Sequence, residues 1–263
     1  MRVSGRRVLI TGASRGIGAE LARAFAAAGA RVALVARSEG PLKELAGELD
    51  GEAFPADLLD AEQVVGLIGR VEAEAGPVDV LVNNAGLENV GYFPAQSPAD
   101  IDAIYRVNLL APVQLCRQVV PRMIERGRGH IVNVSSSADM ITGPGLVTYA
   151  STKAGLTQFS AGLRMELKGL PVKTTRVQVG TVPTDMLDRL HTYGPMDRGL
   201  RRLYRLQIVA DVPTEKLAAA IVQAVERERR HVRLPARNVP MSLMTEAPRR
   251  LIELALIGVK ARD

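Results

Sequence analysis

The fold of this chain is decided by the stretch Val8-Leu9-Ile10-Thr11-Gly12-Ala13-Ser14-Arg15-Gly16-Ile17-Gly18. Three apolar residues, typical of a buried strand, run directly into three glycines spaced Gly-x3-Gly-x-Gly, and a helical pattern follows at 19–28. Glycines at such a strand-to-helix turn let the backbone approach a pyrophosphate, which the amides and positive dipole of the helix N-terminus then bind. The stretch therefore predicts a phosphate-binding loop.

Apolar runs and helical patterns alternate along the first two thirds of the chain. The runs at 8–10, 31–35, 78–82, 130–134 and 173–179 predict strands, and the segments 19–28, 41–49, 61–75, 98–126 and 148–167 predict helices. Buried strands separated by helices are typical of a parallel sheet covered on both faces. We therefore predict a doubly wound α/β fold of the Rossmann type. No joint resembles an interdomain linker, which predicts one domain over 1–263.

Composition excludes several classes of protein. The 263 residues are 47% hydrophobic and 24% charged, with 24 glycines and 15 prolines, which excludes a disordered tail and a collagen-like repeat. The single cysteine, Cys116, excludes an internal disulfide and favours a reducing cytoplasm. The sequence shows no signal-peptide pattern and no apolar run near the ~20 residues of a membrane span, although peripheral membrane contact stays open. No His or Cys pair has metal-ligand spacing, so we expect no metal.

The net charge of +6 lies entirely in the last quarter of the chain. Residues 1–195 carry 20 basic and 20 acidic side chains, and residues 196–263 carry 14 and 8. Such a basic end could meet nucleic acid, an anionic membrane surface or an acidic carrier, or it could simply be solvated. Few aromatic residues accompany the late basic ones, which argues against nucleic acid.

Three motifs resemble those of the short-chain dehydrogenase/reductase family. They are the Gly-x3-Gly-x-Gly loop, the segment Asn83-Asn84-Ala85-Gly86 and the pair Tyr149-x3-Lys153, in the family's order between Val8 and about Met186. The resemblance implies an NAD(P)-dependent oxidoreductase. The cofactor-binding residues that it implies are Gly12, Ser14, Arg15, Gly16, Ile17, Gly18, Asp57, Leu58, Asn84, Ala85, Gly86, Tyr149, Lys153, Gly180 and Thr184.

The predicted catalytic residues are Asn108, Ser136, Tyr149 and Lys153. Tyr149 and Lys153 are four residues apart, so on one helix they share a face, where the ammonium favours the phenolate. Carbonyl reduction would take a hydride from the cofactor and a proton from Tyr149. The resemblance places the carbonyl-polarising serine at Ser136, 13 residues before the tyrosine, and a water-holding asparagine at Asn108. It also implies that Lys153 holds the nicotinamide ribose.

Charge at the end of the second predicted strand indicates NADP(H), with NAD(H) as the less favoured cofactor. An NAD-selective site usually has an acidic residue there, which hydrogen-bonds the ribose 2′-hydroxyl. Here the strand ends at Arg37-Ser38 without an acid, and Arg15 lies in the glycine loop. Two guanidinium groups could bind a 2′-phosphate, unless either one merely points to solvent.

The resemblance is weaker at two places. Asp57 is similar to the family's adenine-contacting aspartate, although it could equally cap a helix that starts near Asp60. Thr184 matches the family's nicotinamide-binding threonine, but Val179 stands where the family has a proline, which predicts a less rigid loop.

The resemblance implies that residues 187–263 form a substrate lid and a specificity region. A helix at 196–205 places Leu200, Leu203 and Tyr204 near one another and four arginines on a broadly opposite face. The apolar face would cover a hydrophobic substrate, and a packed helix with a solvated basic face is the alternative. A further helix is predicted at 212–225. The segment 248–259 predicts a short helix, apolar almost all round, against a second subunit, the substrate pocket or a membrane surface.

We therefore predict a cytoplasmic, NADPH-dependent oxidoreductase that interconverts a carbonyl and an alcohol on a fairly large apolar substrate, such as a steroid, lipid, polyketide or retinoid-like molecule. We expect a homodimer or homotetramer. The alternatives are a 3-ketoacyl-carrier-protein reductase and a non-catalytic dinucleotide-sensing protein, against which intact Ser136, Tyr149 and Lys153 argue. A hydrolase is disfavoured because the serines lack a Gly-x-Ser-x-Gly elbow.

Overall fold

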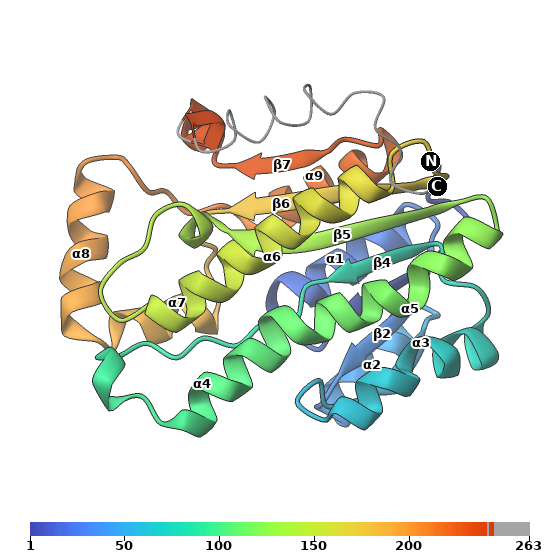
Figure 1. Ribbon diagram of the computed structural model, residues 1–263, viewed down its shortest axis with the longest axis horizontal. Coiled ribbons are helices and arrows are strands. Elements are labelled where there is room, and N and C mark those ends of the chain that lie inside the picture. The colour runs from blue at the N-terminus through green and yellow to red at the C-terminus, as the bar shows by residue number, and fades with distance from the viewer. Residues whose placement is uncertain (241, 245–263) are drawn as a thin grey trace.

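The computed structural model describes residues 1–240 and 242–244. Its centre is a seven-stranded, all-parallel sheet in the order β3-β2-β1-β4-β5-β6-β7 (Figure 1). The strands are β1 (Arg7–Thr11), β2 (Arg31–Ala36), β3 (Glu52–Pro55), β4 (Val80–Asn83), β5 (Gly129–Ser136), β6 (Val172–Val179) and β7 (His231–Leu234). The strand order reverses between β1 and β4, and in such sheets the ligand crevice lies outside the carboxyl ends of the strands at the reversal.

Helices cover both faces of the sheet, as the doubly wound fold requires. Helices α4, α5 and α6 lie in front of the sheet in Figure 1. Val8 and Ile10 belong to a hydrophobic cluster with α1, α2 and α9, whereas Leu9 belongs to the cluster of the opposite face, because successive strand residues point to opposite sides. The helices are α1 (Gly16–Ala27), α2 (Glu39–Glu48), α3 (Ala61–Ala75), α4 (Pro98–Tyr105), α5 (Ala111–Glu125), α6 (Val147–Glu166), α7 (Asp185–His191), α8 (Gly194–Arg205) and α9 (Thr214–Glu226).

The structure confirms the predicted fold class and corrects three details. The edge strands β3 and β7 were not predicted, because each has only four residues and mixes polar with apolar side chains. The helix predicted at 98–126 is instead α4 and α5 joined by a π-helical turn, Arg106–Leu110. Such turns widen the helix locally and are frequent at functional sites.

The C-terminal region places the amphipathic helix α8 over the carboxyl side of the sheet. Its buried Met196 and Leu200 pack on Leu146, and Tyr149 and Tyr204 join this cluster. Arginines on the other side of α8 are exposed. The helix predicted at 248–259 lies outside the described residues. Within residues 1–240 and 242–244, no helix is both long and apolar enough to cross a membrane.

Candidate active site

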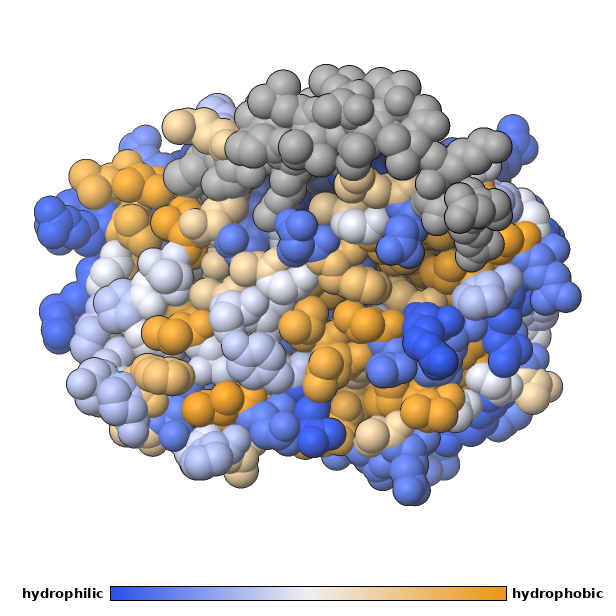
Figure 2. Space-filling model, in the orientation of Figure 1, coloured by the Kyte–Doolittle hydropathy of each residue, from blue (hydrophilic) through white to orange (hydrophobic). Residues whose placement is uncertain are grey.

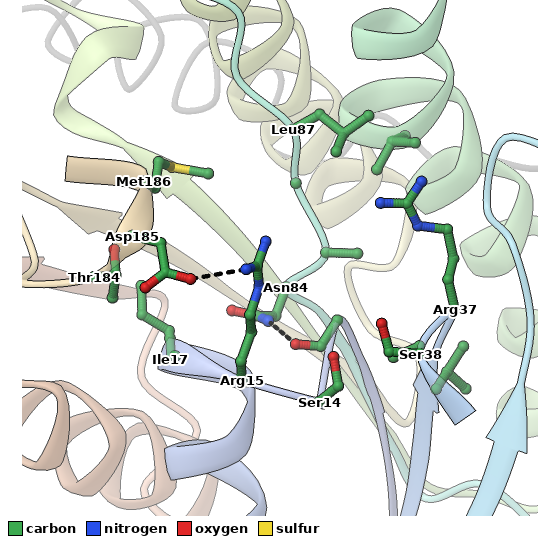
Figure 3. Close-up of a pocket in the computed structure, with 18 of the residues that line it drawn as sticks. Ser14, Arg15, Ile17, Arg37, Ser38, Asn84, Leu87, Thr184, Asp185 and Met186 are labelled. Atoms are coloured by element: carbon green, nitrogen blue, oxygen red, sulfur yellow. Dashed lines mark hydrogen bonds and ion pairs between the residues drawn. The ribbon is translucent and has the colours of Figure 1, made fainter. Parts of the chain in front are cut away.

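A pocket of about 770 Å³ lies at the carboxyl ends of the strands beside the reversal (Figure 3). Its walls come from the glycine loop, the end of β2, the segment after β4 and residues 183–186. Most of the predicted cofactor residues line it, namely Gly12, Ser14, Arg15, Gly16, Ile17, Gly18, Arg37, Asp57, Leu58, Asn84, Ala85, Gly86 and Thr184.

The glycine loop is packed so closely that side chains would disrupt it. A Cβ atom at Gly18 would lie 2.0 Å from the carbonyl oxygen of Gly12, and one at Gly12 would lie 2.8 Å from Cα of Ala85. Gly12 also has a φ of +66°, which L side chains rarely adopt. The first turn of α1 holds no acidic residue, and its N-cap, Arg15, makes no side-chain capping bond. The loop therefore fits a bound pyrophosphate.

Asn84 holds the loop in place. Its Nδ2 donates to the carbonyl oxygens of Thr11, at 3.0 Å, and Gly12, at 3.3 Å. In return, Oγ1 of Thr11 accepts from the backbone amides of Asn84 and Ala85, each at 3.1 Å. The side chain of Asn84 thus joins the end of β1 to the segment after β4 and positions the wall of the pocket.

The two arginines predicted to bind a 2′-phosphate differ in their surroundings. Nη1 of Arg15 pairs with Oδ2 of Asp185 at 2.7 Å, and both side chains are exposed. Arg37 is exposed and forms no ion pair with any residue that the structure describes. Figure 3 shows Arg37 rising from the end of β2, on the other side of the pocket from the Arg15–Asp185 pair. Arg37 is therefore the arginine available to an incoming anion.

Ser136 and Tyr149 come together beside the sheet. Ser136 is the last residue of β5, and Tyr149 lies in the first turn of α6. Burial raises the pKa of the Tyr149 phenol to about 12, while the nearby Ser136 hydroxyl opposes that rise and the Glu88 and Asp139 carboxylates add to it. In this form of the protein Tyr149 holds its proton, as a proton donor must.

Lys153 lies one turn further along α6 and is 5% exposed. Its Nζ donates to the carbonyl oxygen of Val134 at 3.1 Å and lies 5.7 Å from the centre of the Tyr149 ring. Burial lowers the pKa of the Lys153 ammonium to about 8, and the Asp139 carboxylate opposes this shift. A buried cation so close to the ring stabilises the phenolate electrostatically.

Asn108 occupies the π-helical turn and is fully buried. Its Oδ1 accepts from the amide of Leu87 at 2.7 Å, and its Nδ2 donates to the carbonyl of Leu87 at 2.8 Å and to Oγ1 of Thr152 at 3.2 Å. A Cβ at Gly86 would lie 3.6 Å from both Oδ1 of Asn108 and Nζ of Lys153. Gly86, which lines the pocket, therefore lies next to two of the predicted catalytic residues.

Some predicted residues have other surroundings than expected. Asp60, and not Asp57, is the N-cap of α3, and Oδ1 of Asp57 accepts from the amide of Leu59 at 3.0 Å. Gly180, Tyr149 and Lys153 do not line the pocket, and the amide of Gly180 donates to the carbonyl of Leu234 at 2.8 Å. Val179 is buried and is the last residue of β6. The strand therefore includes the position at which the family has a proline.

Two buried carboxylates near Tyr149 were not found from the sequence. Glu88 follows β4 and pairs with Arg189 of α7, and its side chain is only 4% exposed. Asp139 lies three residues after Ser136, and its side chain is 1% exposed. Only that proximity in sequence could have suggested Asp139, because burial of a carboxylate is not visible in a sequence pattern.

Comparison with known proteins identifies the family. A family model described as short chain dehydrogenase matches residues 6–193. The chain belongs to the short-chain dehydrogenases. One similar protein is the carbonyl reductase [NADPH] 2 of Sus scrofa, 36% identical over 214 residues, which cover 81% of this chain and 86% of the relative. Another is the ketoacyl reductase HetN of a Nostoc species, 38% identical over 185 residues, which cover 68% of this chain and 64% of the relative.

Relatives also differ in length and in the cofactor that their structures hold. The matched region covers 70% of this chain but only 62% of a short chain dehydrogenase of Pseudocercospora fijiensis, to which it is 38% identical. A gluconate 5-dehydrogenase of Burkholderia cenocepacia, solved with NADP and tartrate, superposes with a TM-score of 0.79 at 28% identity and covers 89% of this chain and 94% of its own. A Burkholderia phymatum short-chain dehydrogenase/reductase solved with NAD shares the fold at 21% identity, with a TM-score of 0.81 and coverage of 95% and 96%.

Proposed function

We propose that this short-chain dehydrogenase reduces a carbonyl to an alcohol with NADPH, or catalyses the reverse oxidation. The observation that carries the proposal is that Ser136 and Tyr149 come together beside the buried Lys153 ammonium, next to a pocket that fits a dinucleotide. A dinucleotide-sensing protein would need no such proton donor, which disfavours the non-catalytic alternative.

The chain's own residues supply proton transfer and orientation. A bound nicotinamide would supply the hydride. The Ser136 hydroxyl would donate a hydrogen bond to the carbonyl oxygen of the substrate, and the Tyr149 phenol would give that oxygen its proton. The Lys153 ammonium, 5.7 Å from the centre of the phenol ring, lowers the free energy of the phenolate that remains. The proton donor must be re-protonated from solvent before the next turnover.

A preference for NADPH is supported by the end of β2. Arg37 and Ser38 line the pocket there, where an NAD-selective site usually has an acid. Arg37 would bind the 2′-phosphate by charge-assisted hydrogen bonds. Arg15 must first leave Asp185, with which it is paired at 2.7 Å, so we assign the smaller contribution to Arg15.

The substrate is proposed to be a fairly large apolar carbonyl compound. The side of Tyr149 that faces α8 is packed with apolar groups, among them Leu146, Met196 and Leu200. These residues would contact the carbon skeleton of a substrate whose oxygen reaches Tyr149. The test is NADPH oxidation with a panel that contains a steroid ketone, a long-chain aldehyde, an aromatic diketone and an acetoacetyl thioester. Failure of the whole panel, with NADPH bound, would contradict the proposal.

A ketoacyl-carrier-protein reductase is the second candidate function. Its specific support is the exposed basic side of α8, which carries Arg198, Arg202 and Arg205 and faces away from the apolar cluster over Tyr149. An acidic carrier docked there would be attracted electrostatically, so activity on carrier-bound substrate should fall steeply with ionic strength. Activity on a free ketone should change little. Equal salt dependence for the two substrates would exclude carrier docking.

We also infer a homodimer or homotetramer in the cytoplasm. Tyr105, Leu110 and Val147 are apolar and exposed on the face of α4, α5 and α6, where Figure 2 shows hydrophobic side chains at the surface. An exposed apolar patch of this kind favours association. The single, buried Cys116 suits a reducing compartment. Light scattering on the purified protein tests the oligomeric state, and a monomer at micromolar concentration would contradict this inference.

A further inference from the structure

Asp139 is a buried carboxylate whose position is not explained by the sheet alone. It ends the short 3-10 turn Ser137–Asp139, which begins directly after Ser136. The side chain is 1% exposed. Burying a carboxylate is unfavourable unless hydrogen bonds and opposite charges compensate for the lost hydration, so its partners indicate what it does.

The partners of Asp139 join three elements around the catalytic candidates. Its Oδ2 accepts from Oγ1 of Thr157, on α6, at 2.5 Å, and its Oδ1 accepts from Nε2 of Gln178, on β6, at 2.6 Å. Nη1 of Arg176, also on β6, lies 4.0 Å from Oδ2. The carboxylate therefore fixes the turn that follows Ser136 to the helix that carries Tyr149.

A second contact ties the same helix to β5. Oγ of Ser135 donates to the carbonyl oxygen of Lys153 at 3.1 Å and lies 3.0 Å from Oγ1 of Thr157. Ser135 donates its only hydroxyl proton to that carbonyl and Thr157 donates its own to Asp139, so the contact between the two hydroxyl oxygens places β5 against α6 at the residue that binds Asp139. Thr157 lies one turn beyond Lys153, so the Asp139–Thr157 bond acts directly on the segment of α6 that carries the reacting groups.

The charge of Asp139 also acts on both titratable groups of the site. A fixed negative charge opposes deprotonation of Lys153 and of Tyr149, so it raises the pKa of each. For Lys153 it thereby opposes the lowering of the pKa that burial causes. The other charged or titratable groups on elements packed around the pair are Glu88 after β4, Arg176 on β6, Arg189 on α7, Tyr193 at the N-cap of α8 and Tyr204 on α8.

We propose that Asp139 is a positioning residue for the reaction: it holds Ser136 against Tyr149 through Thr157 and supplies the fixed negative charge behind Lys153. This inference rests on the proposed function. It assigns to the turn after β5 a role that the family motifs do not include, since those motifs end at Ser136 and resume at Tyr149.

The test is the pH profile of kcat/KM for NADPH-dependent reduction of an aromatic diketone, or of the panel member that is turned over fastest. Asp139→Asn keeps the size of the side chain and removes the charge. Because both Lys153 and Tyr149 lose a proton more easily without that charge, the basic limb of the profile should move to lower pH by roughly 0.5–1 unit. An unshifted basic limb would overturn the proposal.

A matched control separates this effect from a general loss of stability. Asp79 is also a buried aspartate, 7% exposed at its side chain, and accepts from Nε of Arg128 at 2.7 Å, but it lies at the amino ends of the strands. Asp79→Asn should lower the melting temperature and leave the basic limb where it is. A limb that moved equally in both variants would also overturn the proposal.

Thr157→Val tests the positioning role of Asp139 separately from its charge. It also replaces Asp139→Asn as the test if that variant does not fold. It removes the hydroxyl between the turn and α6 but keeps the carboxylate. We expect kcat to fall by roughly three- to tenfold, with NADPH affinity and the basic limb unchanged, and an unchanged kcat would overturn the proposal. Tyr149→Phe, measured in the same assay, distinguishes failure of the Asp139 proposal from failure of the proposed function. If Tyr149→Phe keeps turnover, the proposed function itself is wrong.

Discussion

The tight packing of the glycine loop allows a sharp test with two glycine-to-alanine substitutions. At Gly18, a Cβ would lie 2.0 Å from the carbonyl oxygen of Gly12 and 2.7 Å from Nδ2 of Asn84. Ordinary contact begins at 3.4 Å, so the loop would have to move by more than an ångström. Overpacking of this kind costs about 1–3 kcal/mol. A domain of this size loses roughly 2–4 °C per kcal/mol, so Gly18→Ala should lower the melting temperature by about 2–12 °C.

The matched control is Gly66, which lies inside α3 with nothing within 4 Å of a Cβ. Alanine there should stabilise the helix by about 0.5–1 kcal/mol, because glycine loses more backbone entropy on folding. The two identical chemical changes should therefore shift the melting temperature in opposite directions.

Cofactor affinity is the second measurement on the same pair. The protein has no tryptophan, so calorimetric titration with NADPH replaces the usual protein fluorescence. Gly18→Ala moves the amides that would bind the pyrophosphate and should weaken NADPH binding at least ~10-fold, which is about 1.4 kcal/mol. Gly66→Ala should leave the affinity unchanged. Wild-type stability and NADPH affinity in Gly18→Ala would refute the assignment of this loop.

Three further expectations concern cofactor choice, the π-helical turn and pH. Arg37→Glu should lower kcat/KM with NADPH more than ~10-fold and change it little with NADH, as paired kinetics would show; an unaltered ratio contradicts the proposed phosphate site. Asn108→Ala leaves both backbone groups of Leu87 without their side-chain partner and should destabilise the protein by about 1–3 kcal/mol in denaturant titrations. The Lys153 ammonium, with its pKa of about 8, is charged below that pH, so kcat/KM for carbonyl reduction should fall as the pH rises through about 8, while Tyr149 stays protonated. A profile that is flat to about pH 10 would count against this assignment.

The sequence was sufficient for the sheet centre and for the loop because both depend on local patterns. Val8 to Gly18 combines a buried strand, the glycines and a helix start, and each of these has its own residue signature. β3 and β7 lie at the sheet edges, where one side needs no partner strand and a short, partly polar segment is enough. Each pairs with a single neighbour, β3 with β2 and β7 with β6, and a local sequence pattern does not encode that pairing.

The contacts of the candidate site depend on residues far apart in the chain. Arg15 and Asp185 are 170 residues apart, and the sequence assigned Arg15 to the 2′-phosphate without its ion pair because nothing local indicates that pair. Asn108 could be selected from the family resemblance, but its bonds to Leu87, which accompany the π-helical turn, could not. Asp139 was missed for the same reason, since Thr157 and Gln178 meet it only in the folded protein.

The most direct test of proton donation from Tyr149 is a single-turnover measurement. Enzyme preloaded with NADPH is mixed with the best carbonyl of the panel, and the decay of nicotinamide absorbance is compared between the wild type and Tyr149→Phe. Phenylalanine keeps the ring in its apolar surroundings and removes only the hydroxyl. The expected result is a rate about 100- to 10,000-fold lower in the variant, with NADPH affinity unchanged. Hydride transfer at the wild-type rate in Tyr149→Phe would contradict the mechanism.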